Sequence, residues 1–69
     1  MAYPNPARDH ITFSGNDIQE VVVYNALGQL MDVVKAEDNA TLSTSNYSNG
    51  VYFARINGSK TVRFAVSRY

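Results

Sequence analysis

The chain contains no cysteine and no tryptophan, and its only histidine is His10. Disulfide bonds and structural zinc sites commonly reinforce small domains, and the sequence argues against both. A chain of 69 residues buries only about 60% of the surface that it exposes when unfolded, so its stability is expected to be modest. We expect neither a metal ion nor a cofactor.

Long apolar runs are also missing. No stretch approaches the roughly 18 apolar residues of a membrane-spanning helix, and the first residues lack the basic flank and apolar core of an export signal. We therefore expect a soluble chain without a membrane span, and an export signal, if there is one, on a longer precursor. Residues 1–69 are assigned to a single domain, and residues 1–2 are expected to be an addition that precedes the natural domain.

The net charge is zero, but the charges are unevenly distributed. Residues 1–38 hold two basic and six acidic side chains, whereas residues 39–69 hold four basic side chains and no acidic one. Either strands of opposite charge pair across a sheet, or the basic part is an exposed docking surface. Pairing is favoured because balanced small domains commonly neutralise themselves. The zero net charge disfavours nucleic acid as a partner.

Apolar residues alternate along the chain, with turn residues between the alternating stretches, and this pattern predicts an all-β domain. Strands are expected at residues 10–13, 18–24, 29–34, 40–43, 51–56 and 60–67, with a seventh possible near the start. A single open sheet would leave one apolar face in water. We therefore expect a small immunoglobulin-like antiparallel β-sandwich of six to seven strands.

Two hairpins follow from the turn residues. Asn57-Gly58-Ser59 should join the last two strands, because Asn-Gly tolerates the positive φ angles of a tight turn. In the last strand, the alternation places Val62, Phe64 and Val66 on the core face. Residues 25–28 should form the other hairpin turn, with Gly28 left-handed. Further turns are expected at residues 14–17 and in the loop at residues 44–50.

Candidate catalytic and metal-binding residues are sparse. His10 and Asp9 with nearby Ser14 could suggest a triad, but adjacent strand residues point to opposite faces. The acidic pair Glu37 and Asp38 lacks the alternating oxygen ligands of a calcium loop. An enzyme is therefore not expected.

Glycosylation and aromatic stacking also have ordinary structural explanations. The Asn-x-Ser/Thr triplets at Asn39, Asn46 and Asn57 fall in predicted turns, where Asn and Ser are favoured for backbone reasons. The five tyrosines and three phenylalanines are interpreted as sandwich core in preference to a platform for sugar or single-stranded nucleic acid.

Three short motifs occur in order: Tyr-Pro-Asn-Pro-Ala at residues 3–7, Val-Tyr-Asn-Ala-Leu-Gly-Gln at residues 23–29 and Gly-Val-Tyr-Phe at residues 50–53. The two prolines favour a stiff, extended lead-in at the first motif. In this order and spacing, the chain from Tyr3 to Tyr69 resembles the C-terminal sorting domains of the Bacteroidetes type IX, or Por, secretion system. The matching signal residues are Tyr3, Pro4, Asn5, Pro6, Gly28, Gly50, Tyr52, Lys60 and Arg63.

The resemblance extends to the end of the chain. Family members carry lysine or arginine near the start of the last strand, often more lysines than here, and end soon afterwards. Lys60 and Arg63 occupy the matching places, and Tyr69 lies two residues beyond the expected strand.

The resemblance implies a domain that directs a larger cargo protein from the periplasm through the outer-membrane type IX translocon. It also implies that a cell-surface signal peptidase or sortase then removes the domain, at a site upstream of Tyr3. Free strand edges are natural docking places, so the basic last strand is our candidate contact. An exposed edge could also pair two copies into a weak homodimer.

Two other functions remain open. An adhesive or carbohydrate-binding sandwich module would require aromatic side chains exposed together. A passive immunoglobulin-like spacer would require only a stable fold, and its deletion would leave export intact.

Overall fold

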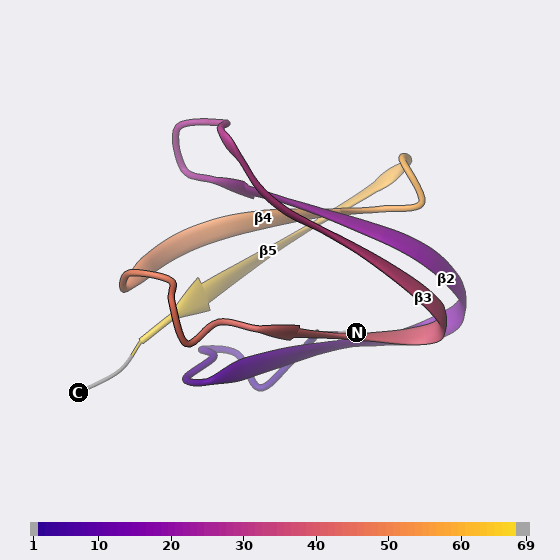
Figure 1. Ribbon diagram of the computed structural model, residues 1–69, viewed down its shortest axis with the longest axis horizontal. Helices are drawn as coiled ribbons and strands as arrows, with labels where there is room; N and C mark the ends of the chain where they lie inside the picture. Colours follow the sequence, from indigo (N-terminus) through magenta and orange to yellow (C-terminus); the bar gives the residue numbers. More distant parts are fainter. Residues whose placement is uncertain (1, 68–69) are drawn as a thin grey trace.

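The computed structural model describes residues 2–67, and every element in this range is a strand (Figure 1). The strands are β1 (Ala2–Tyr3), β2 (His10–Asn25), β3 (Leu30–Ser43), β4 (Gly50–Ile56) and β5 (Lys60–Val66). They pair antiparallel in the order β1-β2-β4-β5, and β3 pairs with the side of β2 left free by β4. Tyr69, two residues beyond the expected last strand, lies outside the described residues.

Two long strands build both layers of the domain (Figure 1). The first part of β2 pairs with β1 and with the last part of β3. The second part of β2 pairs with the first part of β3 and with β4. The sheet thereby folds over itself, which confirms the expected small antiparallel sandwich. Four of the expected strands are joined pairwise into β2 and β3.

The expected turn at residues 14–17 is wrong, because β2 bends there without leaving the sheet. Its pairing with β3 shifts register between Phe13 and Ile18. Asp17 has a φ of 63° and Asp38, opposite the bend on β3, has a φ of 74°. Left-handed residues of this kind bend a strand while the flanking ladder continues, as in a β-bulge. Gly15 N–H also donates to Asn39 Oδ1 at 3.4 Å, which holds the two bends together.

The core lies between the two layers and follows the predicted alternation. Phe64 and Val66 of β5 are 1% exposed, and Val62 packs partly buried against the same core. The Phe64 ring meets Phe13 of β2 edge-on, with centroids 5.8 Å apart, and lies over Tyr52 at 5.7 Å. Phe13, Tyr47, Tyr52 and Phe64 are therefore core, as interpreted from the sequence, whereas the other described aromatic side chains are half-buried or exposed.

Both predicted hairpins are confirmed. Asn57 and Gly58 take φ angles of 52° and 71°, and Ser59 N–H donates to the Ile56 carbonyl at 3.1 Å. At the other hairpin, Gly28 has a φ of 84°.

The charges do not pair across the sheet as favoured from the sequence. Glu20 and Lys35 form an ion pair, but both belong to residues 1–38. Arg55, Lys60 and Arg63 form no ion pair with any residue between 2 and 67. The strands of opposite charge are neighbours, because β2 pairs with β4, but the acidic side chains of β2 and β3 and the basic ones of β4 and β5 form no ion pair within the described residues.

Candidate functional site

The first motif lies against the end of β5. Ala7 is fully buried and forms a parallel bridge with Val66. Its N–H donates to the Ala65 carbonyl at 2.7 Å, and its carbonyl accepts from Ser67 N–H at 2.8 Å. Asn5 Oδ1 accepts from Ala65 N–H at 3.2 Å. We call Asn5 and Ala7, with the β5 residues that they bond, the N-terminal clamp.

The lead-in to this clamp is not extended as expected. Tyr3 of β1 pairs with Thr12 of β2 and is 48% exposed. The chain then bends at residues 4–6. Pro4 and Pro6 are exposed, and the peptide bond before each is cis. The bend carries the chain from β1, beside the first part of β2, to the edge of β5.

The second motif is a turn organised by one side chain. Asn25 Oδ1 accepts from the N–H groups of Leu27 and Gln29, each at 2.9 Å. Asn25 Nδ2 donates to Gln29 Oε1 at 2.7 Å, and Gly28 N–H donates to the Asn25 carbonyl at 3.0 Å. Asn25 and the Gly-Gln pair of the motif therefore form one hydrogen-bonded turn.

The third motif begins β4 and reaches the core. Gly50 has a φ of 154°, in a region that is essentially restricted to glycine. Tyr52 is buried, and its hydroxyl donates to the Ser48 carbonyl at 2.7 Å. Its ring lies 4.9 Å from that of Tyr47.

The three motifs meet at one end of the sandwich. Asn25 of the second motif pairs with Tyr52 of the third. Gly50 pairs with Val66, which also bridges Ala7 of the first motif. A hollow of about 230 Å³ lies between the second and third motifs. The motif residues thus fix this end of the fold, and they also shape its surface.

Tyr47 packs beneath this end and has a shifted pKa. Burial, together with the smaller effects of the negative charge of Asp32 and of the Tyr52 phenol, raises the pKa of Tyr47 to about 12. The Tyr47 phenol therefore stays protonated well above its usual range.

The two predicted basic signal residues do not lie together. Lys60 pairs with Ile56 beside the last hairpin turn, whereas Arg63 pairs with Phe53. Because they are separated by an odd number of positions, their side chains point to opposite faces of β5. One flat partner surface cannot cover both faces.

Arg55, which the sequence analysis did not single out, shares the outer face with Arg63. Tyr24 and Phe53 pair on the same face, half-buried, between β2 and β4. We call Tyr24, Phe53, Arg55 and Arg63 the outer face. A hollow of about 280 Å³ opens there beside Tyr24, Phe53 and Arg55. The register of the predicted hairpin would have identified Arg55, since it places residues 55 and 63 on one face.

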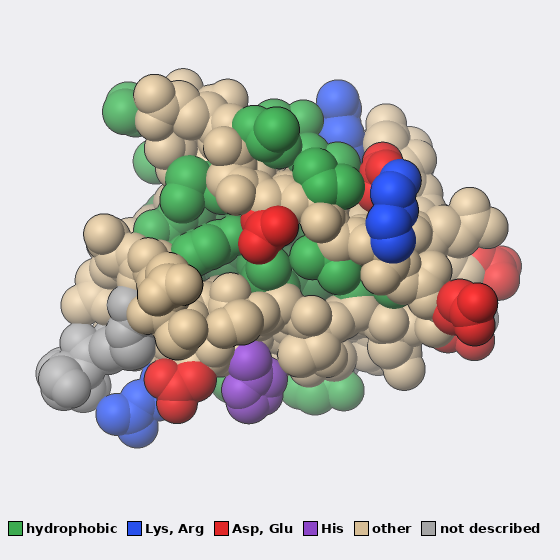
Figure 2. Space-filling model, viewed as in Figure 1, with side chains coloured by type: hydrophobic (Ala, Val, Ile, Leu, Met, Phe, Trp, Pro, Cys, Tyr) green, Lys and Arg blue, Asp and Glu red, His purple; other side chains and the backbone are tan. Residues whose placement is uncertain are grey.

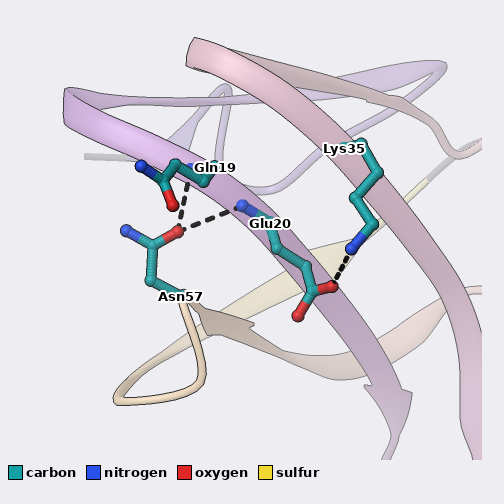
Figure 3. Close-up of polar contacts among 4 residues, drawn as sticks. All are labelled: Gln19, Glu20, Lys35 and Asn57. Atoms are coloured by element: carbon teal, nitrogen blue, oxygen red, sulfur yellow. Dashed lines mark hydrogen bonds and ion pairs between the residues drawn. The ribbon is translucent and has the colours of Figure 1, made fainter.

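Asn57 ties the last turn to β2 (Figure 3). Its Oδ1 accepts from Gln19 N–H at 2.8 Å and from Glu20 N–H at 3.0 Å, and its Nδ2 donates to the Asp17 carbonyl at 2.8 Å. Lys35 reaches Glu20 from the opposite side of β2 (Figure 3). The Asn57 amide is therefore engaged within the fold.

The described residues show little that resembles a catalytic or metal site. His10 is exposed and pairs with Ser43 on β3. No three His, Cys, Asp or Glu side chains gather within the described residues so that they could hold a metal ion. The described part of the chain also has no helix that could span a membrane.

Comparisons with known proteins agree with this geometry. Residues 1–66 match the family described as the secretion system C-terminal sorting domain. Beta-agarase A from Zobellia galactanivorans is 33% identical over 63 residues, which is 86% of this chain and 12% of that protein. The chain thus spans about an eighth of that relative.

A solved structure supports the fold. The protein described as Bacteroides ovatus GH9 superposes with a TM-score of 0.61 and 22% sequence identity, over 88% of this chain and 13% of that one. At this identity the likeness establishes the fold alone. With the family match over nearly all of its residues, the chain belongs to the C-terminal sorting domains of the type IX secretion system.

Proposed function

We propose that this domain is recognised in its folded state by the outer-membrane type IX translocon, and that it directs an attached cargo protein to the cell surface or the medium. A surface peptidase or sortase then removes it upstream of Tyr3. One observation carries the proposal. The motifs that define the family meet at one end of a folded sandwich, so the signal exists as a surface only after folding.

Charged residues of β4 and β5 are the proposed contact. Arg55 and Arg63 are exposed on the outer face and form no ion pair within residues 2–67. They flank the half-buried Tyr24 and Phe53. Arginine beside aromatic side chains is enriched where proteins bind one another tightly. We place Lys60 in a separate contact, because it points to the other face.

The test fuses the chain to the C-terminus of a periplasmically exported fluorescent protein in a bacterium with type IX secretion. Reporter fluorescence is followed in the periplasm, on the cell surface and in the medium. The matched variants are Lys60→Ala, Arg63→Ala and Arg55→Ala. Arg8→Ala is the control, since it removes an exposed cation that lies outside the outer face.

We expect the unaltered fusion to cross the outer membrane, and Arg63→Ala and Arg55→Ala to reduce crossing more than Arg8→Ala does. A stable fusion that stays in the periplasm would overturn the sorting function and favour a spacer. Equal export of all variants would leave sorting intact but remove the outer face as its contact.

Carbohydrate binding is a second candidate, favoured by the paired Tyr24 and Phe53 beside the outer hollow. Aromatic side chains exposed together are the feature that such a module requires. Titration with soluble oligosaccharides, followed by Tyr24 and Phe53 ring signals, tests it. Unchanged signals at millimolar oligosaccharide would dismiss it.

A further inference from the structure

Strand β3 has a free edge. It pairs with β2 along one side, and within residues 2–67 no strand pairs with its other side. Figure 1 shows β3 running along the outside of the sheet, toward the viewer. A strand edge without a neighbour presents backbone N–H and C=O groups in a row to which another strand can bond.

The direction of these backbone groups follows from neighbouring hydrogen bonds. The Glu20 carbonyl accepts from Asn57 N–H at 2.8 Å, so Glu20 and, two positions on, Val22 direct their backbone groups toward β4. Val33 is the β3 partner of Val22, and its N–H and C=O must therefore point away from β2. The Val33 N–H bonds instead to the side chain of Asp32, at 2.9 Å.

The same alternation applies to Lys35, which pairs with Glu20. The free edge of β3 thus directs the backbone groups of Val33 and Lys35 outward, and an added strand would take the Val33 N–H from the Asp32 side chain. These groups are two positions apart, which is the spacing at which an added antiparallel strand forms its hydrogen bonds.

The start of β3 differs from the other strand edges because three apolar side chains are exposed there, beside the charged side chains of Asp32 and Lys35. The end of β5 is covered by the N-terminal clamp, and its start carries Lys60. Strand β1 has only two residues and is followed by prolines. By contrast, Leu30, Met31 and Val33 of β3 are 61%, 40% and 45% exposed. Proteins usually protect such edges with charge, proline or cover.

The charges of β3 indicate which kind of partner segment could bind along its free edge. Asp32, Glu37 and Asp38 are exposed, while Lys35 is neutralised by Glu20. Figure 2 shows hydrophobic side chains across the face on which β3 lies, with acidic ones among them. A second copy of β3 would bring like charges together. An extended segment with alternating apolar and basic residues matches both features.

We propose that residues 30–35 of β3 accept an extended apolar and basic segment of a partner protein as an added β-strand. This mode of recognition draws affinity from backbone hydrogen bonds and specificity from alternate side chains. Assigning the partner to the export machinery rests on the proposed function. The edge itself can be tested without it.

The deciding measurement is amide hydrogen exchange, followed by NMR on the unaltered chain. The probes are a synthetic peptide of alternating valine and lysine and a matched peptide with glutamate in place of lysine. We expect the basic peptide to slow exchange of the Val33 and Lys35 amides by about tenfold or more, and the acidic peptide to leave it unchanged. Absence of protection at Val33, or equal protection by both peptides, would overturn the proposal.

An export assay links the edge to sorting. Val33→Pro removes an N–H that forms no ladder bond to β2, so the strand should tolerate it while an added strand cannot. Val33→Thr keeps the N–H and is the matched control. In the reporter fusion we expect Val33→Pro to lower export about tenfold and Val33→Thr to change it less than about twofold.

The outcomes separate the two proposals. If the unaltered fusion is exported and Val33→Pro is exported equally, the edge proposal is overturned and sorting stands. If the unaltered fusion is not exported, the sorting function fails, and the peptide measurement alone decides whether β3 accepts a strand. If thermal melting shows that Val33→Pro does not fold, the peptide measurement again decides whether β3 accepts a strand.

Discussion

The side chain of Asn57 serves two structural purposes. Its backbone takes the positive φ that the last hairpin requires, and its amide satisfies two N–H groups and one carbonyl at the bend of β2. The turn was predictable, because Asn-Gly specifies it locally. The bonds to β2 were not, since Gln19, Glu20 and Asp17 lie 37 to 40 positions away along the chain.

Replacing Asn57 separates these two purposes. Asn57→Ala should lower the free energy of unfolding by about 2 kcal/mol, because it removes the amide bonds and places Ala at positive φ. Asn57→Gly should cost less, since glycine accepts that φ. Urea denaturation measures both. Equal stabilities for the two variants would show that the φ angle contributes nothing.

Tyr47 should make the stability sensitive to alkaline pH. Its pKa is raised from 10.0 to about 12 in the fold. Above the ordinary pKa of tyrosine, the unfolded chain loses the phenolic proton of Tyr47 while the folded chain keeps it. The free energy of unfolding therefore falls as the pH rises. The stabilisation is complete below pH 10 and should be lost as the pH rises from about 10 to 12.

Denaturant unfolding measured between pH 9 and 12 tests this dependence, with Tyr47→Phe as the comparison. The variant cannot ionise at this position, so its stability should fall less steeply with pH. Parallel curves for the two proteins would show that Tyr47 is not responsible.

At the scale of elements, alternation located the parts of β2 to β5 but not how they join, and it gave no bounds for β1. The first two expected strands form one bent strand, because Asp17 at positive φ lets β2 turn within the sheet. Gly15 and Asp17 resemble turn residues in the sequence for the same reason that they permit a bend. The motifs could likewise be identified in the sequence. That they lie together at one end of the fold could not be predicted, since it depends on the long-range bridge between Ala7 and Val66.

The N-terminal clamp should be sensitive to the size of Ala7. Ala7 is 0% exposed, and Ala7→Val should cost about 1–3 kcal/mol, because added methyl groups have no space there. The amides of Ala7 and Ser67 should then exchange faster than those in the middle of β4. The control is Ala26→Val at an exposed turn position. Unchanged exchange in Ala7→Val would show that the clamp does not close β5.

At the scale of the whole molecule, an aromatic centre around Phe64 joins the two layers within the described residues. Phe64 contacts Phe13 from the first part of β2 and Tyr52 from β4. The alternation of residues 60–67 predicted that Phe64 is buried. Its partners depend on how the layers stack, which one strand's sequence does not encode.

Removing this centre should unfold the domain. Phe64→Ala typically costs about 3–5 kcal/mol, and a single hydrophobic core in a domain this small rarely supplies more than about 3–5 kcal/mol. We expect Phe64→Ala to be largely unfolded at 25 °C and Phe64→Leu to stay folded, as measured by NMR dispersion. The control is Thr61→Ala on the outer face. A well-dispersed Phe64→Ala spectrum would contradict a single shared core.

The strand order also has an electrical consequence. The chain has no net charge, yet negative side chains dominate β2 and β3 and positive ones β4 and β5. A field exerts no net pull on such a dipole, but it does exert a torque. A negatively charged surface would turn β5 toward itself, and a positively charged one β3, before any contact forms. At 0.1 M salt this alignment acts within about 10 Å.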